Sequence, residues 1–112
     1  MSSLASLRPF RGDPAYAASK AAMDSLVRSF SYEYGQQGIT ANAIAPGFVM
    51  TETNKQLASE PKIEEFVKTR IPAQRWAQPE EIANVTLFLA SDAASYINGQ
   101  VIVADAGLSA SL

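Results

Sequence analysis

The 112-residue sequence contains no cysteine and no histidine. Without these side chains there can be no disulfide, no thiolate nucleophile, no Ser-His-Asp triad and no imidazole metal ligand. No apolar run reaches the roughly 18 residues that a membrane span requires. The segment Met1–Arg8 has no leading basic region of the kind that opens a signal peptide. We therefore expect a cytoplasmic protein with no membrane partner and no metal site.

Charged residues are few and nearly balanced, with 9 Lys+Arg against 11 Asp+Glu and a formal net charge of −2. A chain without a basic excess lacks the electrostatic attraction to phosphates that supports nucleic-acid binding. Hydrophobic residues make up 47% of the sequence, which suffices for a packed core. By its length the chain is one domain at most, and we expect no nucleic-acid partner.

A long helix is predicted over residues 14–34. Asp13 precedes Pro14, and this pair is typical of a helix start because Asp caps free amides and Pro is tolerated at the first position. Gly35 or Gly38 supplies the stop. Large side chains recur every three or four positions and predict one packed face. The members of this stripe are Tyr16, Lys20, Met23, Val27, Phe30 and Tyr34.

The rest of the chain alternates short strands with helices. Residues 39–45 and 100–104 are apolar runs bounded by turn residues, and each predicts a buried strand. Between them we expect short helices, the clearest over 63–69, and a second strong helix that opens at Pro79. Residues 2–13 have the composition of a loop. Strands separated by helices indicate a parallel sheet, and two such strands alone are too few, so the sequence resembles the tail of a larger α/β domain.

Tyr16 and Lys20 place a phenol and an ammonium one helical turn apart on one face of the predicted helix. A nearby cation favours the phenolate form of tyrosine, which makes its hydroxyl a usable acid/base group. The spacing alone is common, because a Tyr and a Lys four residues apart are usually no more than a solvated pair. Its meaning depends on the other motifs in the chain.

Four motifs follow one another along the chain. They are Tyr16-x-x-x-Lys20, Asn42 to Thr51 (N-A-I-A-P-G-F-V-M-T), Arg75 to Ala83 (R-W-A-Q-P-E-E-I-A) and Asn98 to Gly107 (N-G-Q-V-I-V-A-D-A-G). In this order and spacing, over essentially the whole chain, the sequence resembles the C-terminal half of short-chain dehydrogenases/reductases of the classical type. The resemblance implies an α/β fold, namely the last two strands and the active-site helix of a Rossmann-like, doubly wound parallel sheet. Residues 1–112 are then a single partial domain.

The resemblance implies a role for each matching position. Tyr16 is the expected general acid/base toward the substrate oxygen, and Lys20 is expected to hold the nicotinamide ribose and to favour ionisation of Tyr16. The catalytic serine falls on Ser3, with Ser2 and Ser6 as alternative placements. The implied reaction interconverts a small-molecule alcohol and a carbonyl by hydride transfer, with NAD or NADP as cofactor. The residues expected to border the nicotinamide are Pro46, Gly47, Val49 and Thr51.

Two departures from the family are visible. The six glycines are dispersed, at positions 12, 35, 38, 47, 99 and 107, and no glycine-rich phosphate-binding turn occurs. We therefore expect that the pyrophosphate-binding half of the domain is missing and that the chain alone has no dehydrogenase activity. The usual Asp-Gly-Gly appears as Asp105-Ala106-Gly107, a change that is either harmless or alters a conformation that glycine allows.

Other residues are expected to be structural. Glu80 and Glu81 suit a helix N-terminus, and Arg75 is expected to position a loop. Several apolar residues could line a substrate pocket or belong to the core instead. They are Phe48, Met50, Leu57 and Phe66.

Three hypotheses about function stay open. The chain is the catalytic segment of an oxidoreductase, or a non-catalytic remnant that serves as an assembly and binding module, or an open reading frame without function. We expect exposed apolar surface, because the missing elements would have covered one side of residues 39–45 and much of the long helix. The resemblance implies a homo-oligomer formed through the long helix and the last strand.

Overall fold

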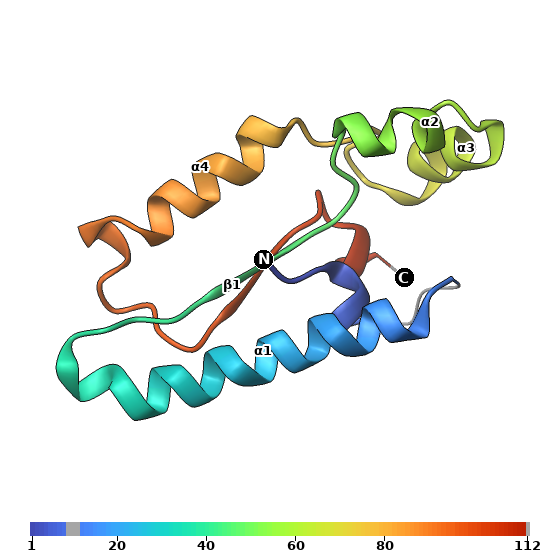
Figure 1. Ribbon diagram of the computed structural model, residues 1–112. Coiled ribbons are helices and arrows are strands. Elements are labelled where there is room, and N and C mark those ends of the chain that lie inside the picture. The colour runs from blue at the N-terminus through green and yellow to red at the C-terminus, as the bar shows by residue number, and fades with distance from the viewer. Residues whose placement is uncertain (9–11, 112) are drawn as a thin grey trace.

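The computed structural model describes residues 1–8 and 12–111, and in them helices alternate with two short strands (Figure 1). The helices are α1 (Pro14–Tyr34), α2 (Lys55–Ala58), α3 (Pro61–Arg70) and α4 (Pro79–Leu89), and the strands are β1 (Ala43–Pro46) and β2 (Val101–Ala104). The order helix, strand, helices, strand is the predicted one.

The two strands pair in parallel, with Ala43 opposite Val101 and Pro46 opposite Ala104. The predicted parallel sheet is therefore confirmed. On the other edge of β1, the Ser2 amide donates to the Ile44 carbonyl at 2.8 Å. The N-terminal segment consequently lies along β1, and this strand is the central and best buried part of the sheet.

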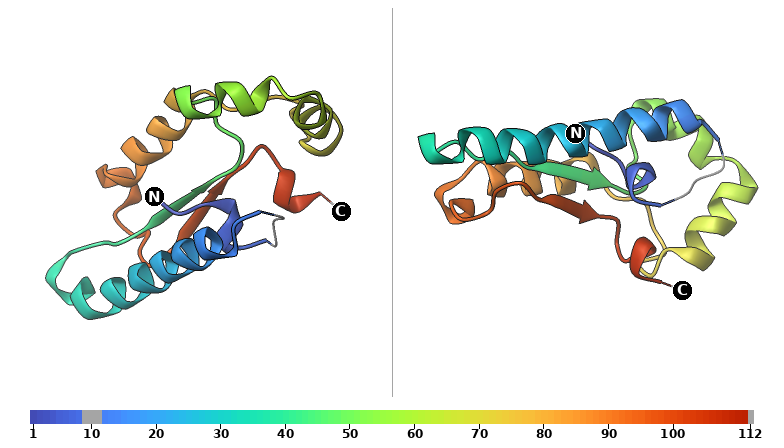
Figure 2. Two further views of the ribbon diagram at one scale, coloured as in Figure 1. Left: turned by 45° about the vertical axis from the view of Figure 1, so that its right-hand side comes forward. Right: turned by 90° about the horizontal axis from the view of Figure 1, so that it is seen from below.

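Helices α1 and α4 lie on opposite sides of the strands (Figures 1 and 2), so the described residues form a helix–sheet–helix arrangement. The layers are incompletely filled. The Cα radius of gyration is 15.2 Å, whereas a compact domain of this length has about 13 Å. Among the described residues no large side chain is fully buried. The architecture is that of a partial Rossmann-like α/β fold, as the sequence predicts.

Helix α1 begins and ends where the sequence predicts. The Asp13 side chain accepts hydrogen bonds from the amides of Ala15 and Tyr16, and Pro14 occupies the first helical position. A 3₁₀ turn follows the helix, and Gly38 closes it with a φ of +76°, which glycine adopts without steric cost. Local capping chemistry is sufficient to set both ends.

The first predicted strand was placed too early. The structure gives Ala43–Pro46 instead of 39–45. The reason is that side-chain hydrogen bonds replace part of the strand pairing before residue 43. The Ala41 amide donates to Asn98 Oδ1 at 2.8 Å, and Asn42 Nδ2 donates to the Ile97 carbonyl at 2.9 Å.

One prediction about residues 2–13 was wrong in part. Residues 4–6 are not loop but a 3₁₀ turn, η1 (Leu4–Ser6), because the Ser3 side chain accepts from the Ala5 amide and Leu4 is buried. Residues 9–11 of this predicted loop lie outside the described residues.

The predicted stripe on α1 is partly buried. Four of its members are half-buried, two are exposed, and the one buried residue of α1 is Asp24.

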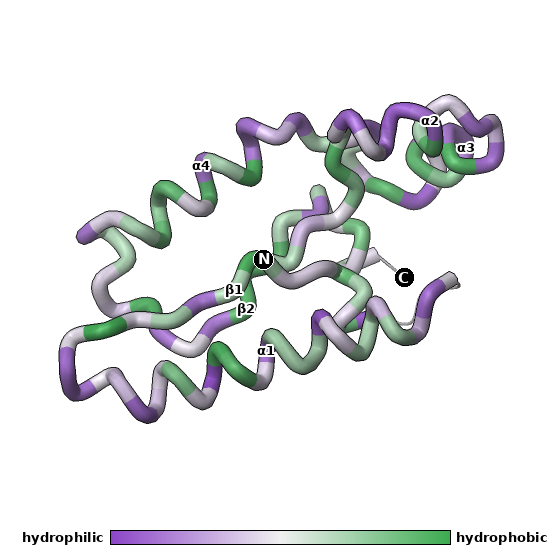
Figure 3. Tube along the Cα trace, viewed as in Figure 1, coloured by the Kyte–Doolittle hydropathy of each residue, from purple (hydrophilic) through white to green (hydrophobic). Residues whose placement is uncertain are grey.

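Hydrophobic and hydrophilic residues alternate along α1 and α4 (Figure 3), as expected for helices that cover a sheet with one face.

No helix in the described part of the chain has the length and apolar character needed to cross a bilayer.

Candidate active site

A cavity of about 210 Å³ opens where α1, η1, the end of β1 and the loop before α4 meet. It brings together Ser3 and Tyr16 with Pro46 and Gly47, which are four of the residues predicted from the sequence. The remaining lining residues are Leu4, Ala5, Asp13, Ala17, Phe48, Asn54, Leu57 and Trp76. A phenol and an aliphatic hydroxyl thus share one largely apolar hollow at the carboxyl end of β1.

Tyr16 stands in the first turn of α1, and 46% of its surface is exposed. The Lys20 ammonium lies 5.5 Å from the centre of the Tyr16 ring, within cation–π range. Lys20 Nζ also donates to the Met1 carbonyl at 2.9 Å. The structure therefore keeps the predicted phenol–ammonium pair together but places Lys20 outside the cavity lining.

Of the three candidate serines, Ser3 is the one that lines the cavity. Its Oγ accepts a hydrogen bond from the Ala5 amide at 3.2 Å, which caps η1. Ser2 is buried, with 3% of its surface exposed, and its Oγ lies 3.2 Å from Ser6 Oγ. Ser2 and Ser6 are engaged with each other rather than with the cavity.

The four residues predicted to border the nicotinamide divide into two pairs. Pro46 and Gly47 line the cavity, whereas Val49 pairs in a parallel bridge with Ala77. The Thr51 amide donates to the Val49 carbonyl at 3.0 Å. Val49 and Thr51 are not among the residues that line the cavity.

Some cavity residues were not predicted. Trp76 packs edge-on against Phe48 with ring centres 5.0 Å apart, and the two rings form one wall. Phe48 and Leu57, which the sequence offered as possible lining residues, do line the cavity. The other two do not: the Phe66 ring centre lies 5.5 Å from that of Phe48, and Met50 lines a different pocket. Trp76 is the only tryptophan in the chain, which was the one available signal for a binding role.

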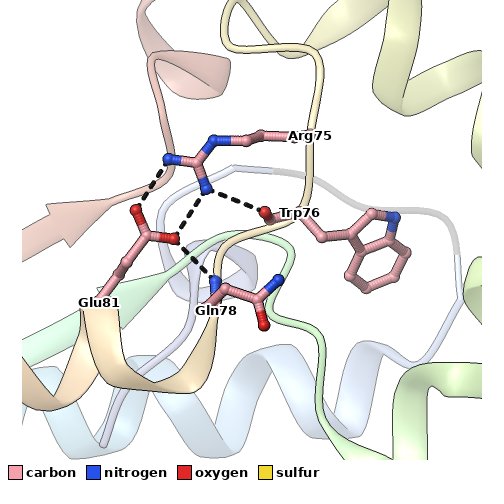
Figure 4. Close-up of polar contacts among 4 residues, drawn as sticks. All are labelled: Arg75, Trp76, Gln78 and Glu81. Carbon is pink, nitrogen blue, oxygen red and sulfur yellow. Dashed lines mark hydrogen bonds and ion pairs between the residues drawn. The ribbon is translucent and has the colours of Figure 1, made fainter.

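Beside this wall, Arg75 and Glu81 form a two-fold ion pair (Figure 4). Nη1 donates to Oε2 and Nη2 to Oε1, both at 2.8 Å, and the Gln78 amide donates to Oε2 at 2.8 Å. These bonds hold the pKa of Glu81 down at about 2. Figure 4 shows the Trp76 ring pointing away from the pair. Arg75 therefore positions the loop that carries Trp76, and Glu81 caps α4, as predicted.

Carboxylates already occupy the starts of α1 and α4. The Asp13 side chain accepts from the Ala15 and Tyr16 amides of α1, and the Glu81 side chain accepts from the Gln78 amide at the start of α4. A carboxylate at each position repels an anion and takes the donors that would bind it. These two helix starts are therefore not free to bind a phosphate. The described residues also contain no cluster of acidic side chains suited to a metal ion.

Comparison with known proteins identifies similar sequences. The family model described as Enoyl-(Acyl carrier protein) reductase matches residues 1–109. The 2-dehydro-3-deoxy-D-gluconate 5-dehydrogenase of Bacillus subtilis is 43% identical over 107 residues, which are 93% of this chain and 42% of that protein. The chain thus spans less than half the length of this relative.

Two solved structures have nearly the same backbone. A gluconate 5-dehydrogenase from Burkholderia cenocepacia in complex with NADP and tartrate has a TM-score of 0.93 at 33% identity, covering 99% of this chain and 44% of that one. A 4-hydroxyisoleucine dehydrogenase complexed with NADH has a TM-score of 0.94 at 31% identity, covering 99% of this chain and 46% of that one.

Proposed function

Because the chain belongs to the short-chain dehydrogenase/reductase family, we propose that it is the catalytic segment of an NAD(P)-dependent oxidoreductase that interconverts an alcohol and a carbonyl. The observation that carries this proposal is the cavity in which Ser3 and Tyr16 face one hollow at the carboxyl end of β1. Ligands of parallel α/β sheets bind at that end of the strands. The rest of the doubly wound sheet, with its pyrophosphate site, lies outside these 112 residues.

In this mechanism Tyr16 is the acid/base group. Its hydroxyl gives a proton to the carbonyl oxygen during reduction and takes one from the alcohol during oxidation. Ser3 accepts from the Ala5 amide, so its own hydroxyl hydrogen is available to the same substrate oxygen. Proton transfer by a positioned group contributes about 10²–10⁴ in rate. A bound nicotinamide supplies or accepts the hydride.

Lys20 lies beside Tyr16. Its ammonium is 5.5 Å from the centre of the Tyr16 ring, within cation–π range. Its ammonium, which donates to the Met1 carbonyl, has further donors for the ribose hydroxyls of a cofactor.

The nicotinamide would be bordered by the segment that leaves β1. Pro46 and Gly47 would lie against the nicotinamide ring, while Val49 and Thr51 would meet its carboxamide. Both NAD and NADP are candidates, since the two similar structures described above hold NADH and NADP respectively. The substrate is a small alcohol or carbonyl compound.

The second candidate function is a non-catalytic assembly module. Leu26 and Phe30 lie one turn apart on α1 and are 53% and 46% exposed, and Val103 of β2 is 40% exposed. This apolar surface favours a homo-oligomer formed through the long helix and the last strand. The two functions are compatible, because a catalytic chain can also assemble.

The test adds the N-terminal, pyrophosphate-binding part of the domain. The N-terminal part of the Bacillus subtilis relative, up to the start of the match, is fused to residues 1–112 or added in trans. Titration with NADH and NADPH is followed through Trp76 fluorescence, and hydride transfer through cofactor absorbance. We expect saturable quenching and measurable turnover from the combined protein, and neither turnover nor tight binding from the chain alone.

Two tyrosine variants separate catalysis from folding. Tyr16→Phe keeps the ring and removes the hydroxyl, so turnover should fall at least about 100-fold. Tyr32→Phe is the matched control, since Tyr32 stands on the same helix with 92% of its surface exposed and no place in the cavity. Full turnover by the Tyr16→Phe protein would overturn the mechanism. Assembly without any turnover would favour the non-catalytic module.

A further inference from the structure

Asp24 is a buried carboxylate on α1 that the mechanism above does not use. Only 3% of its surface is exposed, and its Oδ2 accepts a hydrogen bond from Ser6 Oγ at 2.6 Å. Its Oδ1 has no partner among the described residues. An acidic side chain in such a place is costly, because burial removes its hydration. A short bond to the hydroxyl partly offsets that cost and ties α1 to the N-terminal segment.

The Ser6 hydroxyl connects Asp24 to the backbone that carries Ser3. Ser6 Oγ lies 2.8 Å from the Ser3 carbonyl oxygen and 3.2 Å from Ser2 Oγ. Ser2 is itself fixed to β1 through its amide, which donates to Ile44. The turn that presents Ser3 is thus held between the sheet on one side and Asp24 on the other.

Asp24 shares a face of α1 with the two predicted catalytic residues. Tyr16, Lys20 and Asp24 are spaced by four residues, so they project from successive turns of the helix. Both Lys20 and Asp24 bind the N-terminal segment. Lys20 donates to the Met1 carbonyl, and Asp24 accepts from the Ser6 hydroxyl. These two anchors lie on either side of Ser3 in the sequence.

We propose that Asp24 is a positioning residue that sets the placement of the Ser3 hydroxyl relative to Tyr16. The proposal rests on the proposed function, because it concerns the same pair of hydroxyl groups. Catalysis depends on such placement, since groups misplaced by about 1 Å can cost about 100-fold in rate. Asp24 itself is not among the residues that line the cavity.

The first test measures local order in the full chain by amide hydrogen exchange. The reporters are the Leu7 and Arg8 amides, which donate to the Leu4 carbonyl and close η1. Asp24→Ala and Ser6→Ala should each speed their exchange at least ten-fold, with little change in the middle of α1. Asp24→Asn keeps an oxygen acceptor for Ser6 and should restore most of the protection.

Ser29→Ala is the matched control, because Ser29 is an exposed residue of α1 whose hydroxyl, among the described residues, bonds only to the Ser25 carbonyl. It should leave the η1 amides unchanged. Unchanged exchange at Leu7 and Arg8 in both the Asp24→Ala and Ser6→Ala proteins would overturn the proposal. Equal acceleration across the whole chain would overturn it too, since that result means a general loss of stability. Ser6→Ala keeps the test decisive if Asp24→Ala fails to fold.

The second test uses the combined protein described above. Asp24→Ala should lower kcat at least ten-fold with less than a three-fold change in the cofactor KM, and Asp24→Asn should recover most of the rate. If Tyr16→Phe abolishes turnover while Asp24→Ala leaves kcat intact, the positioning role is wrong and the proposed function stands. If Tyr16→Phe leaves turnover intact, the proposed function fails, and the exchange data alone then decide whether Asp24 orders the turn.

Discussion

Gly47 and Asp105 touch at the carboxyl ends of the two strands. A Cβ on Gly47 would lie 2.8 Å from Asp105 Cβ, a distance that real Cβ atoms essentially never show, and 3.0 Å from Asp105 Cα. Asp105 cannot move aside easily, because its carboxylate accepts from the amides of Gly107 and Ser109 at 3.0 and 2.7 Å. Burial raises the pKa of Asp105, but these hydrogen bonds outweigh it and leave the pKa below its usual range.

Gly47→Ala should therefore destabilise the fold by about 1–3 kcal/mol, the usual cost of forcing extra atoms into a packed place. It should also displace the cavity wall beside Pro46. Gly35→Ala is the matched control, because Gly35 has ordinary helical angles and a Cβ there would meet only Asn98 Nδ2 at 3.4 Å. Urea unfolding of the two variants checks the prediction, and equal stability of both would contradict it.

The Arg75–Glu81 pair should make the stability of the fold depend on pH in the acid range. The pKa of Glu81 falls from its ordinary 4.5 to about 2 through the bonds from Arg75 and the Gln78 amide. A carboxylate with a lowered pKa stabilises the fold fully above its ordinary pKa and loses that contribution as pH falls from about 4.5 through 2. The Tm of the wild-type chain should drop across this window.

Glu81→Gln should lower the Tm at pH 7 and flatten the drop between about pH 4.5 and 2, because the titrating group is gone. Glu80→Gln serves as control, since Glu80 stands in the same turn of α4 without the bonds to Arg75. Thermal melts followed by circular dichroism over this pH range measure both effects. A Glu81→Gln profile parallel to that of the wild type would refute this linkage.

Ala106 occupies a backbone position that suits glycine. Its φ is +55°, a left-handed value that costs a residue with a Cβ roughly 1–2 kcal/mol. Ala106→Gly should relieve this strain, offset by about 0.5–1 kcal/mol of chain entropy, for a net gain near 0.5–1 kcal/mol in the free energy of unfolding. Gly107→Ala should do the reverse, because Gly107 has a φ of +88° and a Cβ there would lie 3.0 Å from Pro72. Chemical denaturation of both variants decides between the harmless and the altering interpretation of the sequence change.

Much of the fold could be predicted because its signals are local. Asp13 and Pro14 start α1 with bonds made inside the first turn, and a glycine ends it, so neither end depends on distant residues. The start of β1 could not be predicted in the same way. It depends on Asn98, more than fifty residues away in the sequence, which takes the Ala41 amide out of any strand pairing.

The candidate site likewise contains residues that local motifs predict and residues that depend on contacts distant in the sequence. Tyr16 and Gly47 stand in recognisable motifs, and the fold brings both to the cavity. Trp76 reaches it from a loop that the Arg75–Glu81 pair holds in place, and no periodicity in the sequence reports such a loop. Asp24 was missed because a carboxylate on an apparently amphipathic helix is normally assigned to the solvent side.

The exposed apolar residues of α1 predict self-association of the 112-residue chain. Leu26 and Phe30 lie one helical turn apart with about half of each side chain exposed. The radius of gyration of 15.2 Å exceeds the value of about 13 Å for a compact domain of this length. Sedimentation velocity should show a weight-average sedimentation coefficient that rises with concentration, and a dye that fluoresces on apolar surfaces should bind.

Replacing both Leu26 and Phe30 by Ser should weaken this association at least ten-fold, because the apolar area removed from water on contact is lost. Leu87→Ser is the matched control, since Leu87 is 71% exposed and belongs to α4, the helix on the opposite side of the strands from α1. It should leave the association nearly unchanged if α1 and β2 form the interface. A compact monomer at every concentration, without dye binding, would contradict the prediction. If only Leu87→Ser weakened the association, the interface would lie on α4 instead.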